Sequence, residues 1–301
     1  MLVVAQSELA YTLGHLGRLR EALAHLDRQR RLYDPVLHER YAALNALDPF
    51  IAGRCQAGRL LWLLGYPDRA LAAVDGAVRM ARDLRVPSGL GFALVYAAYV
   101  HQMRREPDRV RERTEEALAL ATEHGLADVM GWSAIWRGWA VAVETAGRDG
   151  IDAIRQGLAA QRAFGSEIVR PHALALLAEA CRLGGRLDEA RAAVDEAAAQ
   201  AARTGDRYYE PEVHRLRGKL LLAASADAVA EAEAGVRTAI DLARAMDARS
   251  LELRATLSLA RILTGRGERA AAQIAIDAVY KRFEEGFTTA DLREAEARRR
   301  E

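Results

Sequence analysis

A recurrence of small residues is the feature that most constrains how this 301-residue chain folds. One series returns at a fixed interval (98 − 58 = 40) and contains nothing larger than serine: Gly58, Ala98, Gly138, Ala178, Gly218 and Ser258. A second series follows it (70 − 58 = 12) and contains nothing larger than valine: Ala70, Val110, Gly150, Ala190, Ala230 and Ala270. A period of about 40 residues is typical of stacked supersecondary units.

The apolar spacing within each unit is helical. In the fifth unit, Leu174, Leu177 and Cys181 lie on one face of a helix. Gly184 starts a Gly-Gly step that ends this helix, since glycine adopts the left-handed conformation without a Cβ clash, and a second helical pattern begins at Leu187. We therefore predict two antiparallel helices per unit, with small residues where the two backbones approach each other.

The repeat predicts an all-α fold, a single helical-hairpin solenoid domain over residues 1–301 with about seven repeats. The predicted hairpins span 3–33, 37–85, 88–125, 128–165, 168–205, 208–247 and 249–283, and a charged capping helix spans 288–301, with Thr289 as its N-cap. Two Asp-Pro steps, Asp34-Pro35 and Asp48-Pro49, predict a longer connection with a re-entering helix before the second hairpin. In such an array the stability is a sum of neighbouring interfaces, so truncation from either end should lower it gradually.

Composition excludes several classes of function. With 43 Lys+Arg against 42 Asp+Glu the chain has no overall basic field, so we expect no nucleic-acid partner. Its 2 cysteines are too few for a disulfide framework or an all-cysteine zinc site. No basic segment precedes an apolar core at the N-terminus, and the longest uncharged stretch, residues 86–103, contains Pro87, so we expect a cytoplasmic protein with no membrane partner.

Several longer segments carry a family resemblance. YDPVLHERYAALNALDPFIAGRCQAGRLLWLLGYPDRAL, HQMRREPDRVRERTEEALALATEHG, RQGLAAQRAFGSEIVRPHALALLAEACRLGGRLDEA and VYKRFEEGFTTADLREAEA appear in the order found in one group of bacterial proteins. The chain resembles the C-terminal tetratricopeptide-like (TPR) array of that group, which follows an AAA-type ATPase module, often with a class III nucleotide cyclase domain at the front. The resemblance implies a right-handed superhelix and a regulatory role beside an ATPase or cyclase module. It does not carry over nucleotide hydrolysis, because the chain's Gly218-Lys219 step is followed by Leu220 and no phosphate-binding loop surrounds it.

Aromatic residues gather on two predicted first helices. They lie one period apart: Phe92, Tyr96 and Tyr99, then Trp132, Trp136 and Trp139. First helices line the concave surface of stacked hairpins, where partners dock, so these rings form either a groove for an apolar anchor or the core between helices. We expect Trp136 and Tyr96 in the core, and both readings stay open for Trp132, Trp139 and Tyr99.

Charged and polar residues fall near the same predicted surface. They either form a polar rim that binds a carboxylate or belong to a solvated face with ion pairs along each helix, and the second interpretation is favoured. Combined with the aromatic set, the candidate binding residues of the concave groove are Arg59, Trp62, Phe92, Tyr99, Trp132, Trp139, His172, Glu179, Arg182, Arg215 and Lys219.

No motif for catalysis or metal binding is present. The chain lacks G-x-S-x-G and H-E-x-x-H, and we expect His101 to be a hydrogen-bonded residue between helices. We therefore predict a non-enzymatic protein- or peptide-binding scaffold with no cofactor and no metal, acting as regulatory input to an ATPase or cyclase module. The alternatives are a small-molecule sensor with its ligand near Trp132, Trp139 and Tyr99, and an enzyme with an unfamiliar site. Homo-oligomerisation through the terminal hairpins remains open.

Overall fold

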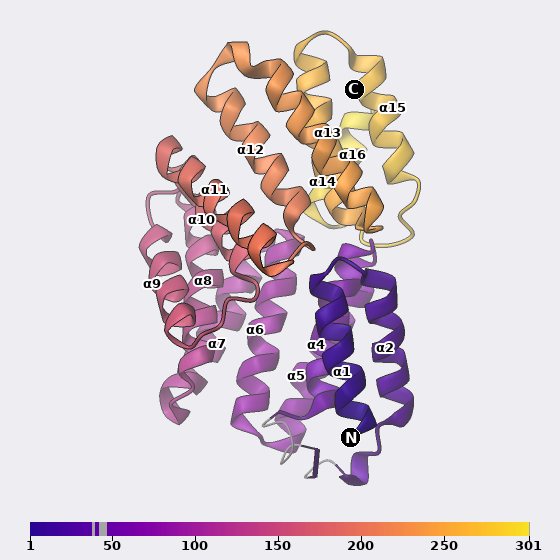
Figure 1. Ribbon diagram of the computed structural model, residues 1–301, viewed down its shortest axis with the longest axis vertical. Coiled ribbons are helices and arrows are strands. Elements are labelled where there is room, and N and C mark those ends of the chain that lie inside the picture. Colours follow the sequence, from indigo (N-terminus) through magenta and orange to yellow (C-terminus); the bar gives the residue numbers. More distant parts are fainter. Residues whose placement is uncertain (38–39, 42–46, 301) are drawn as a thin grey trace.

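The computed structural model describes residues 1–37, 40–41 and 47–300. Every regular element in these residues is helical, and fifteen of them are α-helices. They pair consecutively into seven hairpins: α1 (Leu2–His15) with α2 (Leu19–Leu32), α4 (Pro49–Leu63) with α5 (Pro67–Leu84), α6 (Pro87–Arg104) with α7 (Pro107–His124), α8 (Ala127–Glu144) with α9 (Ile151–Ala163), α10 (Arg170–Leu183) with α11 (Leu187–Thr204), α12 (Glu210–Ala224) with α13 (Val229–Ala245), and α14 (Arg249–Gly265) with α15 (Arg269–Tyr280). The last helix, α16 (Ala290–Arg299), covers α14 and α15 (Figure 1). The predicted all-α, TPR-like helical-hairpin solenoid is confirmed.

Proline and glycine mark the helix boundaries. Four successive helices, α4 to α7, begin with proline, which lacks the N–H that a first helical turn leaves unpaired anyway. Asp48 caps α4, since its carboxylate accepts from the amides of Phe50 at 2.8 Å and Ile51 at 3.2 Å. The re-entering helix predicted between the two Asp-Pro steps falls largely on residues outside the described ones.

The first series of small residues marks close backbone contacts between paired helices. A Cβ placed on Gly138 would lie 2.7 Å from the carbonyl oxygen of Gly150, so α8 and α9 meet backbone to backbone at this point. The second series is wrong for the last two hairpins, where Ala230 and Ala270 are exposed. Their places are taken by the buried Ala232 and Ala272, because the chain between the paired positions is two residues longer there (232 − 218 = 14). In the sixth hairpin this length includes the short 3₁₀ helix η2 (Ala226–Ala228).

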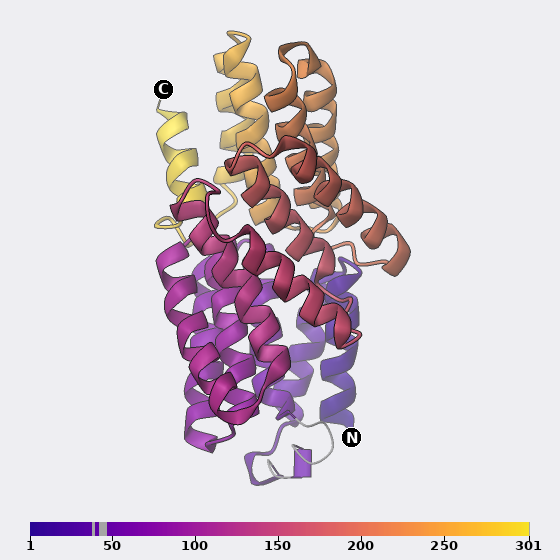
Figure 2. The ribbon, with the colours of Figure 1, turned by 90° about the vertical axis from the view of Figure 1, so that its left-hand side faces the viewer.

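The last hairpins return to contact the ends of the first ones, and we call this the N–C contact (Figures 1 and 2). Ser250 Oγ on α14 donates to the carbonyl oxygen of Trp62 at the end of α4, at 2.6 Å. Arg254 Nη2, one turn further along, donates to the carbonyl oxygen of Met103 on α6 at 2.7 Å, and the Gly286 amide donates to Asp68 at 2.9 Å. The expectation that each hairpin contacts only its neighbours is therefore wrong.

The C-terminal helix begins differently from the prediction. Thr289 occupies the N-cap position, but its hydroxyl donates to the carbonyl oxygen of Gly286 at 2.7 Å and caps no amide of α16. Asp291 in the first turn reaches inward instead and pairs with Arg254. None of the described helices combines the length and apolarity that crossing a bilayer requires.

Candidate binding pocket

The concave face of the array is an interior, because the N–C contact closes it. Arg59, Arg215 and His172, which the sequence places on a solvated or rim surface, are 1%, 2% and 0% exposed. The interpretation of these residues as a solvated face is wrong. Side chains from first helices meet here from opposite sides of the superhelix, so the charges that look solvated in one repeat face another repeat.

Both buried tryptophans among the candidates belong to this interior. The indole N–H of Trp139 donates to Glu179 Oε2 at 2.9 Å, so Trp139 is a hydrogen-bonded core residue. Trp62 lies under the guanidinium of Arg254, 5.0 Å from the ring centroid. The placement of Trp62 and Trp139 on an open groove is therefore wrong.

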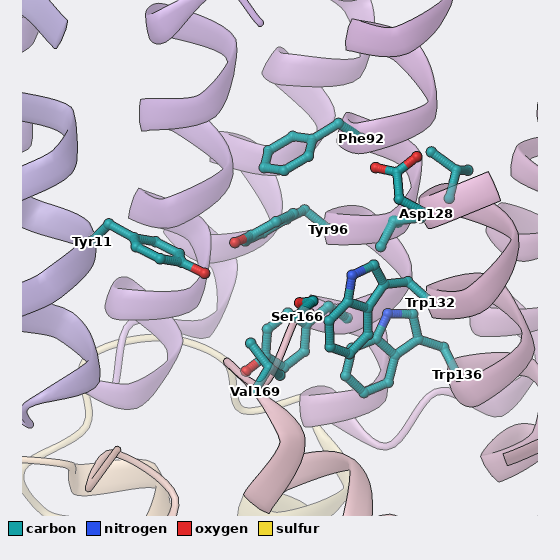
Figure 3. Close-up of a pocket in the computed structure, with 11 residues that line it drawn as sticks. Tyr11, Phe92, Tyr96, Asp128, Trp132, Trp136, Ser166 and Val169 are labelled. Atoms are coloured by element: carbon teal, nitrogen blue, oxygen red, sulfur yellow. The ribbon is translucent and has the colours of Figure 1, made fainter. Parts of the chain in front are cut away.

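Aromatic side chains leave one pocket, with a volume of about 100 Å³, between α1, α6, α8 and the segment before α10 (Figure 3). We call it the aromatic pocket. Its rings are Tyr11, Phe92, Tyr96, Tyr99, Trp132 and Trp136, and Asp128, Ser166 and Val169 are among its other lining residues. Three of the sequence candidates, Phe92, Tyr99 and Trp132, thus come together. Trp136 and Tyr96 are buried as expected and still line the pocket.

Stacking fixes one wall of the aromatic pocket. Trp132 stacks on Trp136 with ring centroids 5.7 Å apart, and Trp136 stacks on Tyr99 at 4.7 Å. Phe92 lies against Tyr96 at 4.7 Å. Trp132 is only partly buried and lines the pocket, so part of its ring is available to a bound group.

A buried histidine fixes the floor beneath these rings. His172 Nε2 donates to Oε1 of Gln102 at 2.9 Å, so its Nδ1 is the acceptor on the other side of the ring. The hydroxyls of Tyr99 and Tyr208 lie 3.1 Å and 3.2 Å from Nδ1 and 2.5 Å from each other, so one hydroxyl donates to Nδ1 and the other donates to its phenol neighbour. The ring of Tyr209 stacks on the imidazole at 3.5 Å. Burial holds the pKa of His172 well below its usual value, so the imidazole is neutral. His172 therefore joins buried side chains of several helices and does not belong to a polar rim of the groove, as the sequence had suggested.

The remaining charged candidates lie toward α12 and α14. Arg215 pairs with Glu212 at 2.6 Å and donates to Ser258 Oγ at 3.3 Å. Burial would raise the pKa of Glu212, but Arg215 outweighs it and lowers this pKa to about 2. Arg215 and burial together lower the pKa of Lys219 to about 7, and Lys219 forms no ion pair in the described residues. Like Glu179, it is half-buried.

Arg182 is the one remaining member of the candidate set, and it lies near Lys219 without an ion pair in the described part of the chain. Its Nε is buried and has no hydrogen-bond partner there. Glu179, Arg182, Arg215 and Lys219 therefore form one polar cluster, separate from the aromatic pocket. His101, the expected bridging histidine, is buried and its Nδ1 lies 2.6 Å from Glu106 Oε2.

The sequence missed several residues of the interior. Tyr11 of α1 lines the aromatic pocket, and His15, one turn later, donates from Nδ1 to Asp206 at 3.0 Å. The amides of Arg207 and Tyr208 donate to the His15 carbonyl oxygen. These pairs lie about 190 residues apart in sequence, and no local pattern indicates them. No group of three or more His, Cys, Asp or Glu side chains in the described residues is arranged to hold a metal ion.

The fold and the interior define this chain as a TPR-like helical-repeat protein. Solved structures of other proteins share the architecture. A Rap protein complexed with competence and sporulation factor superposes with a TM-score of 0.60 at 14% identity, covering 98% of this chain and 77% of that chain. Aspartyl phosphate phosphatase F from Bacillus subtilis gives a TM-score of 0.57 at 12% identity, covering 87% of this chain and 64% of that chain. At these identities the likeness shows the fold.

One curated relative is similar in sequence. An uncharacterized protein of Rhizobium meliloti (strain 1021) is 27% identical over 248 residues, which are 81% of this chain and 24% of that protein. The chain therefore spans about a quarter of the length of the relative that it matches. No family model matches the chain.

Proposed function

We propose that this chain is a non-enzymatic repeat module that binds a protein or peptide partner by holding one apolar side chain of the partner in the aromatic pocket. The observation that carries the proposal is the pocket itself, in which stacked rings from α6 and α8 leave about 100 Å³ open beside the partly buried Trp132. A dry apolar cavity on the order of 150 Å³ holds benzene, so a space of this size suits one side chain rather than a helix. The solved Rap complex, in which a protein of the same fold holds competence and sporulation factor, supports a binding role.

Selection from a displayed library of short peptides tests this function. We expect the wild-type chain to enrich peptides with one aromatic or large aliphatic residue. Those peptides should bind Trp132→Ala at least tenfold more weakly, because the ring face that receives the anchor is lost. Phe287→Ala is the matched control, since Phe287 is an exposed ring outside the pocket. Peptides that bind Trp132→Ala as well as wild type would contradict the proposal.

A small-molecule sensor is the second candidate, because Ser166 and Val169, from the segment before α10, partly enclose the pocket (Figure 3). A ligand stacked on Trp132 would shift the tryptophan emission of the chain. A metabolite screen by fluorescence separates the two candidates: a saturable shift that disappears in Trp132→Ala supports the sensor, and peptide binding without any such metabolite supports the scaffold.

We further propose that the array acts as regulatory input to an ATPase or cyclase module. The resemblance of the quoted segments to such arrays supports this role, as does a relative about four times as long as its match with this chain. Nucleotide turnover by an ATPase or cyclase encoded beside or in frame with this chain, measured with and without a selected peptide, tests it. Turnover that ignores the peptide would contradict the regulatory role.

A further inference from the structure

A groove runs over α4 between α2 and α5, the second helices of consecutive hairpins, and we call it the outer groove (Figure 1). Because first helices turn their other faces to the closed interior, the outer groove lies on the outside of the array. Its volume is about 530 Å³, and none of the described residues lines both this groove and the aromatic pocket. One helical stripe of α4 forms its floor: Phe50, Gly53, Arg54, Ala57 and Leu61.

The floor of the outer groove is apolar and only partly covered. Phe50, Ala57 and Leu61 of α4 are half-buried, as is Leu23 of α2, and Ala72 of α5 is exposed. A cavity on the order of 150 Å³ holds benzene, so the outer groove has room for several side chains of one segment. An uncovered apolar strip of this kind is covered when a segment of a partner docks along it.

Arginines from three helices meet at one end of the outer groove. Arg54 of α4 lies over Gly76 of α5, since a Cβ on Gly76 would be 2.9 Å from Arg54 Cζ. Arg79 follows one turn later on the same face of α5, and Arg30 lines the groove from α2. Burial lowers the pKa of Arg54, and so do the neighbouring charges of Arg79 and Arg30. The three guanidiniums therefore repel one another, and an anion bound between them would relieve this repulsion.

These three arginines lack a counter-charge in the described part of the chain. They form no ion pair there, and Nε of Arg54 is buried without a hydrogen-bond partner. Asp27 is the acid that the described residues place along the groove, and it is exposed and pairs with none of the three. At the other end Arg69 is neutralised, since its Nε donates to Glu285 Oε2 at 2.8 Å. The outer groove is therefore apolar along α4 and positively charged at the end near Arg54.

We propose that the outer groove docks an acidic amphipathic segment of a partner protein, whose apolar side chains cover the floor and whose carboxylates pair with Arg30 and Arg54. This surface is separate from the aromatic pocket, so the inference does not rest on the proposed function. Unpaired guanidiniums favour carboxylates, which they bind through two parallel hydrogen bonds. The apolar floor favours a protein segment over a nucleic acid, whose phosphate backbone has no apolar side chains to place there. The segment also has a direction, with its apolar residues toward Leu61 and its acidic residues toward Arg54.

Selection from a displayed library of short peptides, run in parallel on wild type and on Arg54→Met, tests the inference. We expect wild type alone to enrich peptides in which Asp or Glu residues adjoin Leu, Ile or Phe. In fluorescence polarisation, such a peptide should bind wild type at least tenfold more tightly than it binds Arg54→Met, and at least tenfold more tightly than its Asn and Gln counterpart binds wild type. Arg191→Met is the matched control, because Arg191 is an exposed arginine on α11 without an ion pair in the described residues. Arg191→Met and Trp132→Ala should both bind the peptide as wild type does.

Several results overturn the inference. The library yields no acidic peptide, or its acidic peptides bind Arg54→Met equally well, or Arg191→Met weakens them to the same extent, which shows attraction by overall charge. If all enriched peptides lose affinity in Trp132→Ala and keep it in Arg54→Met, the outer groove is not a docking site, while the proposed function stands. An oligonucleotide of equal charge that binds as tightly, and depends on Arg54 as strongly, contradicts the choice of a protein segment. If Arg54→Met does not fold, Arg30→Met, at an exposed position of α2, makes the same comparison.

Discussion

Asp291 on α16 neutralises the buried Arg254 of α14, and its replacement by alanine measures what this buried ion pair contributes to stability. Arg254 donates to Asp291 Oδ2 from Nε at 2.9 Å and from Nη2 at 2.6 Å, and Nη2 also reaches the carbonyl oxygen of Met103 at 2.7 Å. The same guanidinium therefore joins α16, α14 and α6. Without the carboxylate, Arg254 stays buried and charged.

The magnitude follows from the surroundings of Arg254. Removing one partner of a buried ion pair costs about 3–5 kcal/mol, because the remaining charge has lost its compensation. Glu212, whose Oε1 lies 4.0 Å from Arg254 Nη1, and the Trp62 ring at 5.0 Å retain part of that compensation. We therefore expect Asp291→Ala to lower the free energy of unfolding by about 2–4 kcal/mol.

Equilibrium unfolding in urea, followed by circular dichroism, measures this loss. Glu294→Ala on the same helix is the control: Glu294 pairs with Arg261 at 2.5 Å and Arg298 at 2.9 Å, both partly exposed, so its loss should stay below about 1 kcal/mol. The double variant Arg254→Met/Asp291→Ala should regain most of the stability, since no orphaned charge remains. A loss under about 1 kcal/mol in Asp291→Ala, or one equal to that of Glu294→Ala, would refute the reasoning.

Three further predictions follow from packing and titration. Gly138→Ala should lower the free energy of unfolding in urea by about 1–2 kcal/mol, because the strain of its Cβ against the α9 backbone exceeds the gain in helix propensity. Gly265→Ala is the control: no atom lies within 4 Å of the added Cβ, so the free energy of unfolding should rise by up to about 1 kcal/mol. Equal effects of the two substitutions would contradict this reasoning. Burial lowers the pKa of His15 from 6.5 to about 4, so the unfolded chain takes up a proton at a higher pH than the folded chain does. The free energy of unfolding should therefore fall as the pH drops from 6.5 toward 4. Urea unfolding at pH 7 and at pH 5 should show a smaller loss of this free energy for His15→Gln than for wild type, and an equal loss would contradict the assignment. Cys55 and Cys181 are 0% exposed, and burial raises the pKa of both thiols. A thiol-specific disulfide reagent should therefore label them only when the chain unfolds. Rapid labelling of the native chain would contradict this prediction.

Pairing of consecutive helices was predictable because it leaves a local trace. Where two backbones cross closely, as at Gly138, only a small residue fits, and this requirement returns with each hairpin. The register of the last two second helices was not predictable from the same series. The additional turn residues between Gly218 and Ala232 are polar or small, and nothing in them distinguishes a longer connection from a helix.

The closed interior could not be predicted, since it depends on rotation that accumulates over successive hairpins. Arg59 and Arg215 have the helical spacing of solvated residues, and only contacts with distant repeats show that they are buried. The aromatic pocket was partly predictable, because Phe92 and Trp132 lie one period apart on neighbouring hairpins. Tyr11 was missed because it reaches the pocket from the first hairpin, on the other side of the superhelix.

The N–C contact also constrains the order of folding events. Its hydrogen bonds join residues between 151 and 218 positions apart, whereas the contacts within each hairpin are local. Long-range contacts form only after the intervening chain is arranged, so the hairpins assemble first and the two ends meet last. The same contact is then the first to open when the native array fluctuates, and native-state hydrogen exchange should report this opening as a step well below global unfolding. Each opening briefly uncovers the inner face of the superhelix, so the chain's own ends control access to that face.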